Sequence, residues 1–133
     1  PAANYVPYVK SNKLIFVSGQ IPILNGELVT GKIGKNIEIE DAKTAARLCG
    51  LAIVSQLNEA TDLDLDKIKR IIKLGGFVNC IDEFMQQPEI INGASDLMVE
   101  VFGDKGKHSR FAVGTNSLPR NVVVEIEAIA EIH

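Results

Sequence analysis

The sequence of 133 residues contains no tryptophan, and aromatic side chains make up only 5% of it. It has two cysteines, Cys49 and Cys80, which are too few for a disulfide framework and form no CxxC pair. Both lie among apolar neighbours, so we expect buried free thiols. The uncharged apolar runs are only a few residues long, far short of the ~20 that a membrane-spanning helix needs. These absences argue against a disulfide-stapled module and against a membrane span.

The sequence also lacks an excess of positive charge. Its 14 Lys and Arg residues are outnumbered by 17 Asp and Glu residues, which leaves a net charge of −3. The basic residues between positions 67 and 73 have no interleaved aromatics and are offset by nearby acids, so a solvated strand face is favoured over a nucleic-acid stripe. The N-terminus shows no secretory signal pattern, and we expect a cytoplasmic protein. The length predicts a single domain over residues 1–133.

Hydrophobic periodicity predicts six strands and two helices. We expect strands at 5–10, 14–18, 27–30, 67–80, 110–115 and 121–132, and helices at 39–60 and 89–102. Pro88 suits the first turn of the second helix. Gly75 and Gly76 inside a strand predict a bulge or a close approach to the backbone. The order β-β-β-α-β-α-β-β indicates a two-layer α+β domain with both helices on one face of a single mixed sheet.

Two charged residues stand out in the C-terminal strands. Arg110 opens one strand, and Glu125 interrupts the strongest strand pattern in the chain. Val123 and Ile129 share the face of Glu125, so that face needs partial cover, and a second copy of the chain is the natural candidate. A simple turn at 116–120 would set Arg110 opposite Glu125, but the linker is long enough to cross another strand. An interface salt bridge without chemistry is the plain structural interpretation of this pair.

No motif calls for a metal or a cofactor. The aspartates between Thr61 and Asp66 alternate with leucines, which is typical of a solvated turn rather than a ligand set. Gly31 and Gly34 lack the surrounding strand and lysine-bearing helix of a phosphate-binding loop. His108, a lone histidine in a Gly/Lys loop, is expected to be solvated.

The chain resembles the RidA (YjgF) family of reactive-intermediate or imine deaminases over nearly its whole length. The spacing from Arg110 through Leu118-Pro119 to Glu125 is the family spacing without a gap. The other motifs that carry the resemblance are FVSGQIP at 16–22, GFV at 76–78 and VEIEAIA at 124–130. Such an ordered set is far more specific than any one motif.

The resemblance implies a chorismate-mutase-like fold, a homotrimer with clefts between subunits, and no cofactor. In family clefts an arginine clamps a carboxylate while a glutamate positions water, which hydrolyses an imine or enamine to a 2-oxo acid and ammonia. By motif, Arg110 is the clamp and Glu125 the water partner. The resemblance adds further substrate-binding residues: Tyr8, Ser18, Gly19, Asn92 and Ala112.

The sequence departs from the family pattern at several positions directly after Arg110. Phe111 stands where a serine is usual, Ala112 where a cysteine is frequent, and Gly114-Thr115-Asn116 replaces a more typical Glu-Val-Ala stretch. They indicate a distinct subgroup. Two other functions are compatible with the resemblance: an endoribonuclease or translation inhibitor, and a non-catalytic, small-carboxylate-binding or chaperone-like trimer.

Overall fold

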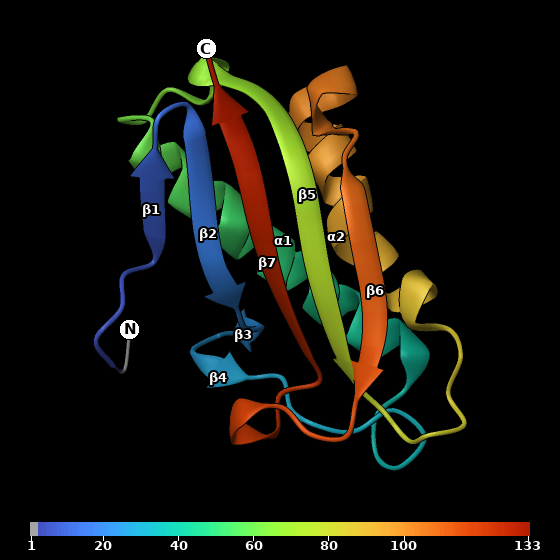
Figure 1. The fold of residues 1–133 in the computed structure, drawn as a ribbon. Coiled ribbons are helices and arrows are strands. Elements are labelled where there is room, and N and C mark those ends of the chain that lie inside the picture. The colour runs from blue at the N-terminus through green and yellow to red at the C-terminus, as the bar shows by residue number, and fades with distance from the viewer. Residues whose placement is uncertain (1–2) are drawn as a thin grey trace.

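Two long helices cover one face of a five-stranded sheet, and the opposite face is open in the described chain (Figure 1). The structure, a computed structural model, describes residues 3–133. Along the chain its elements are β1 (Tyr8–Ser11), β2 (Leu14–Gln20), β3 (Ile23–Leu24), β4 (Glu27–Leu28), α1 (Ile39–Ala60), β5 (Ile68–Asn79), α2 (Gln87–Phe102), β6 (Ser109–Thr115) and β7 (Val124–Ile132).

The main sheet has the order β1-β2-β7-β5-β6 and is mixed, because β5 and β6 run parallel while the other neighbours are antiparallel. This confirms the expected two-layer α+β fold. The predicted strand at 27–30 is shorter than expected and lies outside the main sheet. Asn25 and Gly26 take φ values of 53° and 81°, so the chain folds back at once and pairs β4 with β3 in a separate two-stranded sheet.

The core lies between the sheet and α1, whose alanine-rich stripe lets the helix approach the strands closely. Its fully buried members are Ala42, Ala45, Ala46, Cys49, Ile53 and Leu57. They face the alternate residues of β7, including Ile126 and Ala130, which are also fully buried. Cys49 and Cys80 are buried free thiols, as expected. Burial, with a smaller contribution from Glu125, raises the pKa of the Cys49 thiol far above its ordinary value.

The glycine pair in β5 provides close approaches on both faces of the sheet rather than a bulge. A Cβ at Gly75 would lie 2.6 Å from the Phe111 ring on the open face, and one at Gly76 would lie 2.6 Å from Ile91 of α2. The pairing of β5 with β7 does contain register shifts, but they lie before the glycines, between Ile68 and Arg70 and between Ile71 and Lys73. Each glycine therefore makes room for one side chain.

No helix of residues 3–133 has both the length and the apolar character to cross a bilayer.

The crossing of α1 and α2 supplies a test of packing. A Cβ at Gly93 would collide with the backbone carbonyl of Lys43, whereas one at Gly50 would meet the flexible end of Leu97 at 2.9 Å. We expect Gly93→Ala to lower the free energy of unfolding by roughly 2–3 kcal/mol, because backbone cannot yield as a side chain can.

The matched change Gly50→Ala should be nearly neutral, since helix propensity improves by ~1 kcal/mol when alanine replaces glycine. Urea unfolding followed by circular dichroism measures both variants. Equal losses in the two would contradict this account of the helix crossing.

Candidate functional site

A β-bulge in β2 brings Glu125 against the backbone of Gly19. The two strands pair regularly as far as Val17 opposite Ala128, and the register shifts before Gln20 meets Ile126. Between these pairs, Ser18 and Gly19 of β2 lie opposite the single residue Glu127 of β7, so β2 has one extra residue. A Cβ at Gly19 would collide with the Glu125 carboxylate, so only glycine lets this side chain lie there.

Glu125 is a half-buried carboxylate with a raised pKa. Burial is the larger cause and the charge of Glu127, two residues along β7, is the smaller one. Among the described residues, no lysine or arginine lies within ion-pair distance of Glu125 to offset them. A carboxylate whose pKa is shifted toward neutrality exchanges protons with water more readily than an ordinary surface glutamate.

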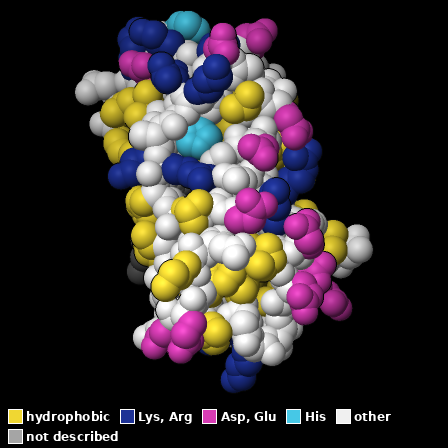
Figure 2. Space-filling view, turned by 90° about the vertical axis from the view of Figure 1, so that its right-hand side faces the viewer, with side chains coloured by type: hydrophobic (Ala, Val, Ile, Leu, Met, Phe, Trp, Pro, Cys, Tyr) yellow, Lys and Arg dark blue, Asp and Glu magenta, His cyan; other side chains and the backbone are white. Residues whose placement is uncertain are grey.

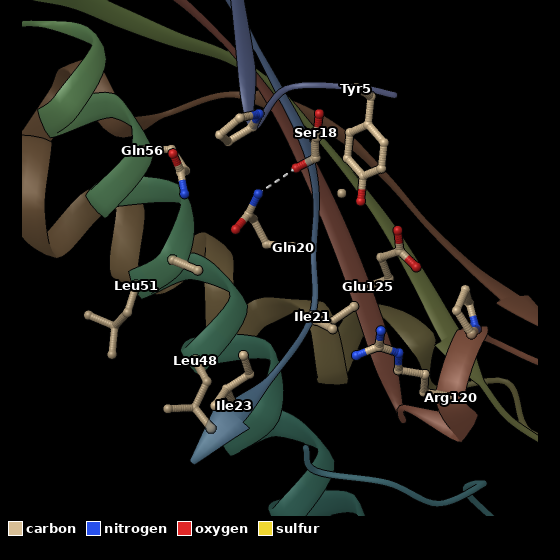
Figure 3. A pocket seen from close by; sticks show the side chains of 14 residues that line it. Tyr5, Ser18, Gln20, Ile21, Ile23, Leu48, Leu51, Gln56, Arg120 and Glu125 are labelled. Atoms are coloured by element: carbon tan, nitrogen blue, oxygen red, sulfur yellow. Dashed lines mark hydrogen bonds between the residues drawn. The ribbon is translucent and has the colours of Figure 1, made fainter. Parts of the chain in front are cut away.

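Glu125 forms part of the wall of a cavity of about 920 Å³ (Figure 3). Helix α1 supplies the apolar side with Leu48, Leu51 and Ala52. The N-terminal segment closes another side, tied down by Ser18, whose hydroxyl donates to the carbonyl of Val6 at 2.8 Å. The site therefore combines a half-buried carboxylate with apolar side chains and with the polar side chains of Gln20 and Gln56.

The tyrosine in this cavity is Tyr5, which is not among the residues that the sequence motifs indicate. Its hydroxyl points toward the Glu125 carboxylate in Figure 3. Tyr8, the predicted substrate-binding residue, does not line the cavity, because it pairs with buried Val17 and so faces the helices. Burial, and then the nearby charge of Glu59, raises the pKa of the Tyr8 hydroxyl. Tyr5 lies before β1, outside any strand, so no local pattern separated the two tyrosines.

Arg120 is a second cavity residue absent from the predicted site. It takes a left-handed conformation with φ 57°, and Asn121 after it does the same with φ 59°. Buried Asn79 holds this turn, since its side-chain amide donates to Asn121 Oδ1 at 3.3 Å and to the carbonyl of Val122 at 3.2 Å. The strained turn directs the Arg120 guanidinium into the cavity beside Glu125 (Figure 3).

Arg110 belongs to a different cluster, between β6 and α2. It pairs with buried Leu74 and therefore faces the helices. Its Nη1 donates to Ser95 Oγ at 3.0 Å and its Nη2 to the carbonyl of Pro88 at 3.4 Å. Asn92 lies on the same face of α2 as Pro88 and Ser95, because it is four residues after the one and three before the other. Ala112 lies two residues after Arg110 in β6 and therefore on the same face of the strand.

His108 joins this cluster, contrary to the expected solvated position. Its Nε2 lies 2.8 Å from Ser95 Oγ, and its Nδ1 lies 2.6 Å from the carbonyl oxygen of Gly106. A histidine two residues before a strand arginine shares its face of the backbone, and this spacing was the available signal.

Within one chain the two predicted catalytic residues are kept apart. Glu125 pairs with Phe77 and faces the open side, whereas Arg110 faces the helices. Strand β5 also lies between β6 and β7, so the alternative of a simple turn joining the last two strands is wrong. A salt bridge of Arg110 with Glu125 in the same chain is likewise absent from the described residues.

Phe111, the conspicuous departure after the clamp position, points away from Arg110. Its ring lies over Gly75 on the open face and makes an edge-to-face contact with Phe77 at 5.3 Å between centroids. Lys73 Nζ lies 5.4 Å from the ring centroid. The substitution therefore alters the open face of the sheet rather than the surroundings of the Arg110 side chain.

The open face carries an apolar surface that extends across the sheet. Val9, Phe16 and Ile129 are paired neighbours on β1, β2 and β7, and Phe77 pairs with Val113 at the other edge. Val9 is 52% exposed and Phe16 41% exposed. Exposed apolar side chains that gather on one face are a common feature of surfaces through which proteins associate.

Residues 3–133 contain no group of three or more His, Cys, Asp or Glu side chains that could hold a metal ion. In the aspartate-rich turn, Asp64 Oδ1 accepts a hydrogen bond from the backbone N–H of Asp66 at 3.1 Å. This is the ordinary structural role of a turn aspartate.

Comparison with known proteins places the chain among relatives of the same fold. The sequence profile described as "YjgF/chorismate mutase-like, putative endoribonuclease" matches residues 1–132. Protein TCP17 of Trypanosoma cruzi is 44% identical over 135 residues, which cover 100% of this chain and 84% of that protein.

Two solved structures show how far the backbone likeness extends. Atu1372 of Agrobacterium tumefaciens, described as a protein of unknown function, is 49% identical with a TM-score of 0.96, over 99% of this chain and 84% of its own. Escherichia coli TdcF, solved with bound serine, is 27% identical with a TM-score of 0.67, over 100% of this chain and 91% of its own. The chain therefore belongs to the YjgF family, also called the RidA family, and has its chorismate-mutase-like fold.

Proposed function

We propose that this protein hydrolyses 2-imino acids and their enamine tautomers, of the 2-aminoacrylate type, to 2-oxo acids and ammonia. The site lies between two subunits of a homotrimer, with Arg110 of one chain clamping the substrate carboxylate and Glu125 of the next positioning water. The observation that carries this proposal is the separation of Arg110 and Glu125 on opposite faces of one chain. A ligand held by both needs two copies.

A trimer of this kind joins two different surfaces of the chain. A closed ring with threefold symmetry repeats one head-to-tail contact, so the Arg110 cluster of one copy meets the Glu125 cavity of the next. The apolar open face of the sheet supports such association. Contact along that face would exclude water from Phe16 and Phe77, which are 41% and 39% exposed in the single chain.

Arg110 has the donors that a carboxylate clamp requires. A guanidinium has five N–H donors in a planar fork, and the contacts to Ser95 and Pro88 use two of them. The remaining three, including Nε–H, suffice for two parallel bonds to a carboxylate. The related TdcF was solved with serine, a molecule that carries a carboxylate, and this supports the assignment.

Glu125 has the properties of a group that takes a proton and gives it back. Its raised pKa favours acceptance of a proton from water as the oxygen attacks the imine carbon. The new C–O bond forms while the C=N electron pair of the protonated imine moves to nitrogen, giving a neutral carbinolamine. Protonated Glu125 then returns its proton to the nitrogen, and ammonia leaves as the hydroxyl proton passes to the Glu125 carboxylate and the carbonyl forms. General acid–base assistance of this kind contributes about 10²–10⁴-fold.

The family description also names an endoribonuclease, and the charge of this chain argues against it. The net charge is −3, and Figure 2 shows basic, acidic and hydrophobic side chains interspersed on the side formed by α2 and β6. Ribonuclease activity of purified protein that survives Arg110→Ala would favour that function. A non-catalytic carboxylate-binding or chaperone-like trimer would bind 2-oxo acids through Arg110 without accelerating imine hydrolysis.

The first test measures imine hydrolysis directly. 2-Aminoacrylate is generated enzymatically in the assay, and release of 2-oxo acid and ammonia is followed. We expect Arg110→Ala to lower kcat/KM at least ~100-fold, and Arg110→Lys to restore little, because an ammonium cannot form the bidentate contact. Wild-type protein no faster than Arg110→Ala would rule out the deaminase.

Mixed trimers test whether the site is shared between chains. Arg110→Ala and Glu125→Gln proteins are each expected to be inactive, but every mixed cleft that draws Arg110 from one variant and Glu125 from the other is intact. Random 1:1 reassembly should therefore recover about a quarter of the wild-type activity in a ring of head-to-tail contacts. No recovery, with exchange of subunits verified by mass spectrometry, would contradict a shared site.

The raised pKa of Glu125 predicts the pH dependence. As a base Glu125 acts only when deprotonated, so kcat/KM should fall as the pH drops through a pKa above the ordinary value for glutamate. Glu125→Gln should remove this fall of kcat/KM at low pH, the acidic limb of the pH profile, along with most of the activity. Glu127→Gln is the matched control and should shift the limb to lower pH, because it removes a negative neighbour. An unchanged limb in Glu125→Gln would exclude Glu125 as the titrating group.

A further inference from the structure

A serine and a histidine connect Arg110 to a fixed backbone carbonyl. Arg110 Nη1 donates to Ser95 Oγ at 3.0 Å, Ser95 Oγ lies 2.8 Å from His108 Nε2, and His108 Nδ1 lies 2.6 Å from the carbonyl oxygen of Gly106. The contacts join α2, β6 and the short 3-10 helix Gly103–Gly106. All of them lie on the helix side of β6, away from the Glu125 cavity of the same chain.

Only one arrangement of protons satisfies these contacts with a neutral imidazole. A carbonyl oxygen can only accept, so His108 carries its proton on Nδ1 and donates it to Gly106. Nε2 is then an acceptor, and Ser95 donates its hydroxyl proton to it. The lone pairs of Ser95 Oγ remain free to accept from Arg110. Hydrogen bonding therefore runs in one direction along the path Arg110, Ser95, His108.

The far end of this path is anchored from two sides. A Cβ at Gly106 would collide with the carbonyl of Met98, so the Gly106 backbone packs directly against α2. The next carbonyl, that of Lys107, accepts from Arg70 Nε at 3.2 Å and Nη2 at 3.0 Å. The Gly106 carbonyl consequently has a fixed position relative to both α2 and β5.

We propose that Ser95 and His108 are positioning residues, which hold the Arg110 guanidinium in the orientation that receives the substrate carboxylate. This inference rests on the clamp role of Arg110 in the proposed function. An unrestrained arginine side chain loses rotamer freedom when it binds a ligand, and this loss weakens binding. The path from Gly106 restricts the side chain before the ligand arrives, which preorganises the clamp.

The path also accounts for the distribution of donors on Arg110. Ser95 and the carbonyl of Pro88 hold one proton each of Nη1 and Nη2, which fixes the plane of the guanidinium against α2. Nε–H and one proton on each Nη remain for an anion. A planar carboxylate can use two such donors at once, whereas a spherical anion such as chloride gains little from the fixed plane.

The experiment removes the hydrogen bonds of Ser95 and of His108 in turn, and then restores each with a second substitution. Ser95→Ala removes the hydroxyl and Ser95→Thr keeps it, while His108→Phe removes the acceptor and His108→Gln offers an amide oxygen in its place. Ser109→Ala is the matched control: Ser109 adjoins Arg110, but its hydroxyl donates to the carbonyl of Ile72 at 2.9 Å. Circular dichroism and sedimentation verify that each variant folds and assembles like the wild type.

Dissociation constants for pyruvate, a 2-oxo acid, are measured by calorimetry, and KM and kcat are measured for imine hydrolysis. We expect Ser95→Ala and His108→Phe to raise Kd and KM about 10-fold, the size expected for loss of one hydrogen bond to a charged group. kcat should change much less, because the lost interaction serves substrate and transition state alike. Ser95→Thr and His108→Gln should recover most of the affinity, and Ser109→Ala should match the wild type.

Nitrogen NMR of the His108 ring supplies a readout independent of turnover. The wild type should show the neutral form protonated at Nδ1, and Ser95→Ala should shift the Nε2 resonance, because Nε2 loses its donor. A ring protonated at Nε2 in the wild type would overturn the proposed path.

Failure of this inference differs from failure of the proposed function. If Arg110→Ala abolishes pyruvate binding while Ser95→Ala and His108→Phe bind like Ser109→Ala, Arg110 is a clamp that needs no positioning residues. If Arg110→Ala also binds pyruvate normally, the clamp role itself is wrong, and both proposals are overturned.

Discussion

Strand β7 lies in the middle of the sheet, and its register against β2 and β5 governs the rest of the structure. Because strand side chains alternate, this register turns Val124, Ile126 and Ala128 toward the helices and Glu125 and Glu127 toward the open face. A slip by one residue would bury two carboxylates without partners, which costs several kcal/mol for each. The same register sets Glu125 beside the bulge at Gly19.

The order of the strands then divides the functional residues between two sides of the molecule. Strand β5 separates β6 from β7, so the Arg110 cluster lies at one edge of the sheet and the Glu125 cavity nearer the other. Arg110 is surrounded by neutral donors and acceptors from α2, while Glu125 lies near apolar groups and a second carboxylate. The Glu125 cavity also contains the Arg120 guanidinium, but the proposed carboxylate clamp is Arg110 on the other side of the molecule, which ties the proposed chemistry to self-association.

At three glycines, a side chain or a helix packs directly against the backbone. Gly19 accommodates the Glu125 carboxylate, Gly75 accommodates the Phe111 ring, and Gly106 packs its backbone on α2. In each case the missing Cβ lets a group from another element lie against the backbone. Phe111 thus belongs to the open face, so this departure from the family pattern alters that face rather than the surroundings of the Arg110 side chain.

The sequence by itself determined the helix stripes, the alternation of the strands, the two-layer α+β class and the two candidate charges, because periodicity and local turn chemistry depend only on neighbours along the chain. The motif spacing of Arg110, Leu118-Pro119 and Glu125 was likewise sufficient to identify the family. Only the tertiary structure decided that β5 separates β6 from β7, that Tyr5 rather than Tyr8 lies in the cavity, and that His108 is bonded to Ser95. The reason is physical: strand order, the left-handed turn at Arg120 and the Arg110 path depend on contacts between residues far apart in sequence, which no local pattern encodes.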